Sequence, residues 1–239
     1  MQMQILRYLL VVTLFLGISN INAQRNITEG QIKMEITDVN SDDQAIASQL
    51  EMMKGGETVY AFSSNQSLVT MNMMGGMIKM ETLTDNESEN STMLFDMMGQ
   101  KMMVSSTKED RAETVAQQKD AFKDIKVTYD ENDTKEIMGY KCYKAVASGG
   151  ELPFSFEMYV TKELSIDPKL IQGMEGLDLN GFPLEYQMKM EQMSMTYSAT
   201  EVESEINSEI FNLKTEGYKK MTFKEFEEQM KGLGGGMGF

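Results

Sequence analysis

The sequence contains no histidine and no tryptophan, a single cysteine, and only three prolines among its 239 residues. Without histidine, Ser-His-Asp and Cys-His catalytic arrangements are excluded, and so are nearly all zinc sites. The lone cysteine, Cys142, cannot form a disulfide within the chain, so a sizeable hydrophobic core must hold the fold together. No spacing singles out a pair of carboxylates for acid–base work. We therefore expect no catalytic residue, no cofactor and no enzymatic activity.

Long hydrophobic runs are missing after the first twenty residues or so. Arg7 precedes an apolar run from Tyr8 to Ile18, and Ile21-Asn22-Ala23 offers a cleavage site before Gln24. This run is too short to cross a bilayer and is typical of a secretory signal peptide, here residues 1–23. Cys142 lies far from the cleavage site, so no cysteine is placed to carry a lipid anchor. We expect an exported protein, periplasmic or secreted, that is soluble, not lipid-anchored and without a membrane span.

Basic residues are scarce: 22 Lys and Arg stand against 37 Asp and Glu, a formal charge of −15. Loss of the predicted signal peptide removes one base and no acid, which makes the charge −16. Such a charge argues against nucleic acid as a partner and against binding to anionic lipid surfaces through basic patches.

The clearest pattern in the chain is an alternation of apolar and polar residues from Phe182 to Met190. The two-residue period indicates a strand with one buried face. The alternation slips at Glu191-Gln192 and resumes on Met193, which predicts a bulge or bend, with a hairpin as the alternative. A long strand that bends while keeping one apolar face belongs to a curved antiparallel sheet.

Further strands follow at short spacing between turn residues such as Gly75-Gly76, Gly99-Gln100 and Asp85–Ser91. We predict a mostly β (α+β) fold: a curved antiparallel sheet, or half-open β-barrel, of about eleven strands with two or three short helices as plug or lid. Capping boxes at Ser41 with Gln44 and at Thr222 with Glu225 mark two of these helices. The expected organisation is one domain over residues 24–231, with an extended piece at 209–213, and a flexible Gly-rich tail at 232–239.

Methionine is unusually frequent, with 25 residues, and 23 remain after residues 1–23. Three interpretations stay open. Methionine can replace Leu and Ile as ordinary core filler, it can line an adaptable cavity, or several thioethers can converge on Cu(I). The candidate cavity wall consists of Phe156, Met158, Tyr186, Met188, Met190, Met193 and Met195. The alternative copper ligands are Met71, Met73, Met74 and Met77, and no other metal site is expected.

Four blocks of the sequence resemble the exported bacterial family known as domain of unknown function 4412. They are residues 97–101 (MMGQK), 137–145 (IMGYKCYKA), 180–186 (NGFPLEY) and 217–222 (GYKKMT), and the resemblance runs from Gln31 to Gly232. It implies no catalytic residue. Its strand layout is similar to the lipoprotein-carrier and mycobacterial lipid-carrier half-barrels, in which helices close a curved sheet over an apolar cavity.

The leading hypothesis is therefore a non-enzymatic envelope protein that binds a lipid or other hydrophobic small molecule on a Met-rich concave face. Two alternatives remain open at this point: a Cu(I)-binding periplasmic protein, and a sensor or interaction module whose sheet binds another envelope protein.

Overall fold

The computed structural model describes residues 27–150, 154–164, 166, 170–171, 174, 176–190 and 192–232, apart from the side chains of residues 118 and 230–232. The predicted signal peptide lies outside the described residues, and so do residues 233–239 of the predicted tail. Gly232, where that tail was expected to begin, is the last residue of a helix.

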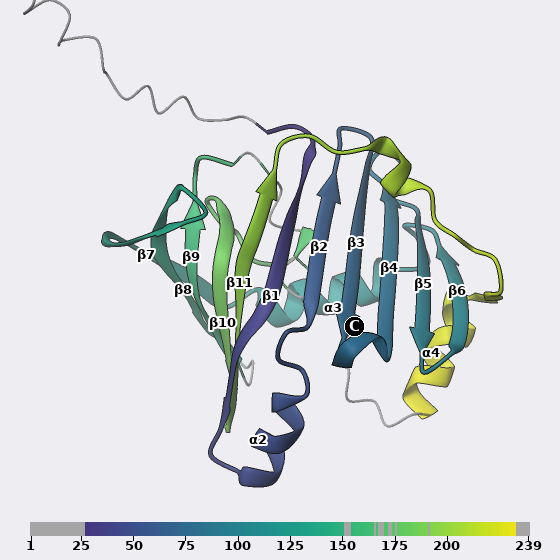
Figure 1. Cartoon of the computed structure of the whole chain (residues 1–239), viewed down its shortest axis with the longest axis horizontal. Helices are drawn as coiled ribbons and strands as arrows, with labels where there is room; N and C mark the ends of the chain where they lie inside the picture. Colours follow the sequence, from purple (N-terminus) through teal and green to yellow (C-terminus); the bar gives the residue numbers. More distant parts are fainter. Residues whose placement is uncertain are drawn as a thin grey trace, which may run out of the picture.

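Twelve strands in the described part of the chain form one sheet, in the order β12-β6-β5-β4-β3-β2-β1-β11-β10-β9-β8-β7 (Figure 1). All neighbours are antiparallel except β12 and β6, which are parallel. The predicted fold class is thus confirmed. The strands are β1 (Gly30–Ser41), β2 (Glu57–Phe62), β3 (Gln66–Met73), β4 (Ile78–Asp85), β5 (Ser91–Met97), β6 (Gln100–Ser106), β7 (Ile125–Ile137), β8 (Tyr140–Gly149), β9 (Phe154–Thr161), β10 (Phe182–Met190), β11 (Met193–Glu203) and β12 (Lys219–Thr222).

The slip in the alternation at residues 191–192 is a hairpin. Strands β10 and β11 pair antiparallel up to Lys189 opposite Ser194, so the chain reverses there instead of bending. Of the two interpretations left open by the sequence, the hairpin is the correct one.

The helices are α2 (Gln44–Glu51), α3 (Ala112–Phe122) and α4 (Phe223–Gly232), with short 3₁₀ turns η1 (Met74–Gly76) and η3 (Ser208–Phe211). The capping box at α4 is confirmed: Glu225 accepts from the Thr222 N–H at 2.8 Å, and Thr222 Oγ1 accepts from the Glu225 N–H at 3.2 Å. The box predicted at Ser41 is wrong, because Asp43 caps α2. The extended piece predicted at 209–213 is also wrong, because most of it belongs to η3.

The sheet curls strongly around one face. Tyr60 lies on β2 and Phe182 on β10, with β1 and β11 between them. Neighbouring strands are about 4.8 Å apart, so a flat sheet would separate β2 from β10 by roughly 14 Å. The two ring centroids are only 6.4 Å apart. The face that carries both rings is therefore the concave face.

Each face has its own cover. On the concave face, buried side chains of the β9–β10 connection, such as Leu164, Ile171 and Leu177, join the main core cluster. Helix α2 packs at one end of β1 and β11, and Phe226 of α4 packs over β4, β5 and β6. On the convex face, Phe211 and its neighbours pack against β2, β3 and β4. Figure 1 shows the convex face toward the viewer, with η3 in front of the sheet and α3 behind it.

Candidate functional site on the concave face

All seven predicted cavity-wall residues lie on the concave face of three adjacent strands. Phe156 of β9 pairs with Met188 of β10, which pairs with Met195 of β11. In the next row, Met158 pairs with Tyr186. Met190 and Met193 continue the same face toward the β10–β11 turn. The alternation of the sequence therefore placed these side chains together.

Their surroundings divide this predicted wall into two parts. Phe156, Met158 and Tyr186 are buried in the main core cluster, which the β9–β10 connection covers, and Met195 is buried beneath α2. Met188, Met190 and Met193 are half-buried. The inner part of the wall thus belongs to a packed core, and the three half-buried methionines form its accessible part.

Aromatic rings fill the middle of the trough. Tyr186 stacks on Tyr197 of β11, with ring centroids 4.6 Å apart and an interplanar angle of 14°. Burial raises the pKa of Tyr186, and neighbouring Tyr60, which shares a hydrogen bond with it, raises that pKa further. Burial also raises the pKa of Tyr197. Because these phenols reach across the curled sheet, this section of the trough is occupied by the protein's own side chains.

Beyond the aromatic section, strands β3, β4 and β5 carry apolar side chains that remain partly open to solvent. Val69, Thr82 and Met93 form one row across these strands. The adjacent rows contain Met71, then Met73 with Ile78 and Met97. All seven are half-buried, and none is charged. We call this set the concave strip: Val69, Met71, Met73, Ile78, Thr82, Met93 and Met97.

The concave strip was not predicted as a ligand wall, although its alternation is present in the sequence. On β4 and β5 the members alternate in phase with buried Met80 and Phe95, and on β3 they alternate in phase with Met71, which pairs with Met80. Alternation alone could not separate the strip from the core, because both have the same period. What separates them is the cover, since α4 packs on Met80, Phe95, Met102 and Val104 but leaves the strip half-buried.

Helix α3 crosses behind the sheet in Figure 1, on the side of the concave face. It connects β6 to β7, which lie near opposite edges of the sheet. A helix that packs on a sheet buries a stripe of side chains. Among the side chains of α3 that the structure describes, which leave out residue 118, only Phe122 is buried and only Thr114 is half-buried. The other described side chains are exposed all around the helix: Ala112, Glu113, Val115, Ala116, Gln117, Lys119, Asp120 and Ala121.

This exposure means that α3 is a strap anchored by Phe122 and does not pack on the strands in front of it. Phe122 contacts the Phe154 ring of β9, with centroids 6.1 Å apart. A Cβ placed on Gly176 would lie 2.8 Å from the Phe122 Cβ, so the anchor fits tightly against the β9–β10 connection. The concave strip is consequently not covered by a packed α3, and its side chains stay half-buried.

Hydroxyl groups mark the other end of the same strands. Ser67, Thr84, Ser91 and Ser106 form one row across β3, β4, β5 and β6 on the concave face. The Oγ atoms of Ser91 and Ser106 are 2.8 Å apart. The concave face of these strands is therefore apolar at the η1 end and hydroxylated at the opposite end.

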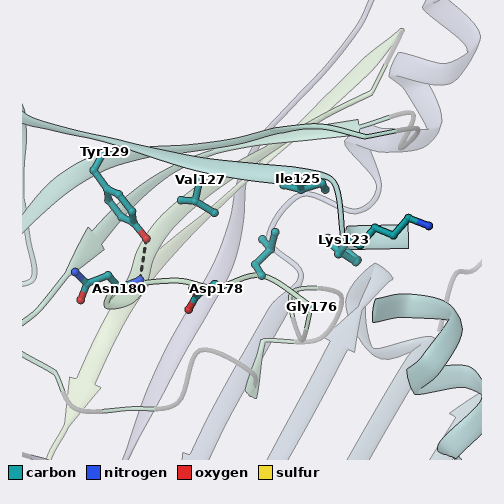
Figure 2. A pocket seen from close by; sticks show the side chains of 9 residues that line it. Lys123, Ile125, Val127, Tyr129, Gly176, Asp178 and Asn180 are labelled. Carbon is teal, nitrogen blue, oxygen red and sulfur yellow. Dashed lines mark hydrogen bonds between the residues drawn. The ribbon is translucent and has the colours of Figure 1, made fainter. Parts of the chain in front are cut away.

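A separate cavity of about 460 Å³ lies at the β7 edge of the sheet. Figure 2 shows Ile125, Val127 and Tyr129 of β7 facing the segment that carries Gly176, Asp178 and Asn180. The Tyr129 hydroxyl accepts a hydrogen bond of 2.8 Å from the Asn180 N–H. The lining also includes Lys123, and none of the seven predicted wall residues belongs to it.

The predicted copper ligands lie on β3 and in the turn that follows it. Met71 and Met73 belong to the concave strip, whereas Met74 lies in η1 and Met77 follows it in an exposed turn. Among the described residues, no group of three or more His, Cys, Asp or Glu side chains is placed to hold a metal ion.

Cys142 is fully buried, and burial raises the pKa of its thiol to about 12, with Glu163 and Glu185 adding to the shift. A nucleophilic cysteine needs an accessible thiolate, so its surroundings are those of a core residue. Within the described part of the chain, no helix has the length and apolar character needed to cross a membrane.

No protein-family model and no curated protein matches the chain, so the resemblance to the domain of unknown function 4412 family remains a prediction. Among solved structures, the chain is similar to the lipoprotein LppX of Mycobacterium tuberculosis, at 7% identity and a TM-score of 0.37, over 78% of this chain and 92% of that one. It is also similar to an uncharacterized conserved protein from Thermus thermophilus, at 8% identity and a TM-score of 0.36, over 89% and 99% of the two chains.

LprF from Mycobacterium bovis is similar at 10% identity and a TM-score of 0.34, over 77% of this chain and 90% of that one. The expected likeness to mycobacterial half-barrels is thus found. Because all three TM-scores are below 0.5, these likenesses carry no argument about function.

Proposed function

We propose that this protein is a non-enzymatic envelope protein that binds a lipid or other hydrophobic ligand on its concave face, in the concave strip beneath α3. The observation that carries the proposal is that the concave strip is uncharged and half-buried and that α3, on the same face of the sheet, does not pack on it. Apolar surface held half-open inside a concavity is what binding sites for hydrophobic ligands require.

The dimensions of the concave strip suit an acyl chain. From Ile78 in the concave strip to Thr84 in the hydroxyl row, strand β4 advances six residues, or about 20 Å, of which the strip itself covers about 13 Å. One leaflet of a bilayer has a hydrocarbon thickness of about 15 Å, so the strip together with the hydroxyl row is long enough for a single chain. Burying methylene groups contributes about 0.8 kcal/mol each, and roughly ten would supply the 8 kcal/mol of a micromolar complex before ordering costs.

The chemistry of the strip favours such a ligand over a polar one. Methionine is flexible and polarizable, so Met71, Met73, Met93 and Met97 can adapt to chains of different shape. The hydroxyl row at the other end offers hydrogen bonds to a polar head. The cavity at β7 suits a hydrophobic ligand less, because the charged residues Lys123 and Asp178 are part of its lining.

The test is native mass spectrometry of protein purified from its own envelope after export, followed by organic extraction and by uptake of a fluorescent fatty acid. Met93→Gln, on the concave strip, should weaken uptake. Met103→Gln is the matched control, because Met103 is also half-buried on a neighbouring strand but faces the convex side. Protein that is always empty and takes up no fatty acid, or equal losses in both variants, would overturn the proposal.

A further inference from the structure

Two adjacent hairpin ends form one uncharged methionine surface. The Met98 N–H at the β5–β6 turn donates a 2.8 Å hydrogen bond to the Met77 carbonyl at the β3–β4 turn, so the two turns lie side by side. We define the methionine tip as residues 73–78 and 97–100, with the sequences MMGGMI and MMGQ. None of these ten residues is charged.

Folding alone does not explain the methionines at these positions. Met98 and Gly99 form a two-residue hairpin loop with φ of 53° and 88°. A loop with both φ values positive favours Asn or Asp followed by Gly, because other side chains are strained in the left-handed region. Met74 has the same φ of 53°. Met98 is 78% exposed and Met77 46% exposed, so neither is held by packing.

The charges at the base of the methionine tip differ from those of the rest of the molecule. Lys79, Asp96 and Lys101 form one row on the convex face, with a net charge of +1 in a chain whose formal charge is −15. Asp96 also accepts a 2.9 Å hydrogen bond from the Gly99 N–H. This row of three residues therefore adds no net negative charge beside the tip.

The methionine tip also meets the concave strip. Met73, Ile78 and Met97 belong to both, so an apolar surface runs from the exposed turns into the trough without a charged side chain. A stable protein–protein contact buries about 800 Å² on each partner. Two turns of ten residues are small for that purpose, whereas exposed apolar side chains can insert singly at a membrane interface.

We propose that the methionine tip docks on a phospholipid bilayer by inserting Met74, Met77 and Met98 at the boundary between head groups and acyl chains. Lys79 and Lys101 then lie at head-group level. This docking does not depend on a ligand in the concave strip, because the tip is complete without one.

The experiment is flotation of the exported, purified protein with vesicles of phosphatidylcholine and phosphatidylethanolamine. The double variant Met77→Gln/Met98→Asn should lower vesicle partitioning at least about tenfold, since burying one methionine side chain contributes about 1.5 kcal/mol or more. Asn is the residue that this turn favours, so thermal stability should stay the same or rise. A loss of binding then cannot come from unfolding.

The chain supplies a matched control in Met138. It precedes Gly139 in the β7–β8 turn with the same φ of 53° and is 47% exposed, but it lies at the opposite end of the sheet. Met138→Asn should leave partitioning unchanged, and raising the salt concentration should change it little because insertion is apolar.

Absence of wild-type flotation, or an equal loss in Met138→Asn, would overturn the docking. Self-association in solution that Met98→Asn abolishes, without any vesicle binding, would overturn it as well and assign the tip to a second copy. The fatty-acid uptake assay uses no membrane, so failure of one proposal is distinguishable from failure of the other.

Discussion

Replacing Phe122 by alanine should release the strap α3 without unfolding the sheet. Phe122 is 8% exposed, and it is the single buried side chain among the described residues of α3. An isolated helix of eleven residues is only marginally stable in water. The helix therefore depends on this anchor, whereas the strands depend on their own hydrogen bonds and on core clusters to which Phe122 contributes one residue among many.

The size of the effect follows from the contacts of the ring. Burying a Phe side chain contributes about 1.5–3 kcal/mol, and an aromatic pair such as Phe122 with Phe154 adds about 0.5–1.5 kcal/mol. A loss of roughly 2–4 kcal/mol raises the population of the detached strap about 30- to 700-fold. The same outcome is expected for Gly176→Ala, because the new Cβ would lie 2.8 Å from the Phe122 Cβ and 2.9 Å from its Cγ.

Hydrogen exchange read by mass spectrometry measures this directly. Peptides covering residues 111–124 should lose protection in both variants, while peptides from β3 to β6 keep theirs, and fatty-acid uptake should become faster. Phe226→Ala is the control: it removes the anchor of α4, whose ring lies 6.1 Å from Phe95, and should leave α3 unchanged. Wild-type protection of residues 111–124 in Phe122→Ala would refute the strap assignment.

Three further outcomes are expected. Cys142 should resist alkylation at pH 8 in the folded protein and react only after unfolding, because burial raises its pKa to about 12; rapid labelling of native protein would contradict this. The Thr222 N–H donates to the Glu225 carboxylate and holds the pKa of Glu225 below its ordinary value of 4.5. The stabilisation of α4 by this carboxylate is therefore complete above about pH 4.5 and is lost as the pH falls through the lowered pKa. Acid should therefore expose α4 in hydrogen exchange, and Glu225→Gln should remove that pH dependence. Peroxide should oxidise Met98 and Met138 before buried Met80, and fatty acid should protect Met93 without protecting Met138; equal protection of both would contradict binding at the strip.

The sequence predicted the strands well because alternation is a local signal. Residues 182–190 show a two-residue period in the sequence, and the concave side chains of β10 follow that period in the structure. The turns at residues 75 and 99 were also predicted, and their glycines adopt the positive φ values for which glycine is favoured, whereas the turn at Gly139 was not predicted. β12 contains only four residues, too few to show a period, and it pairs with β6 across more than a hundred positions of sequence.

The helix caps show how closely two local signals can compete. Ser41 and Asp43 both suit a helix start, and the predicted box assigned the cap to Ser41. In the structure Asp43 Oδ1 accepts from the N–H groups of Ala45 and Ile46 at 2.7 and 3.1 Å. Ser41 Oγ instead accepts from the N–H of Asp43, the residue before the helix, at 3.1 Å. The carboxylate is the stronger acceptor and lies directly before the helix, so it takes the cap.

What the sequence could not supply is the order of strands in space and the depth of the curl. The seven wall residues were placed on one face correctly, but whether that face is open depends on partners far away in the chain. Phe182 meets Tyr60, more than a hundred residues earlier, and together with Tyr186 they fill the part of the trough that was predicted to be hollow. The half-buried surface lies on β3, β4 and β5, beside the residues Met80 and Phe95 on which α4 packs.

The methionine pairs, which a core-only interpretation explained least well, now separate by environment. In Met73-Met74 and Met97-Met98 the first residue faces the trough and the second adopts a left-handed turn conformation. Met102 is buried under α4, and Met103 faces the convex side. Of the six methionines in these three pairs, only Met102 is a buried core residue. Strip and tip methionines share strands β3 and β5, so under the two proposals one hairpin arrangement supplies both the ligand-binding strip and the membrane-docking tip.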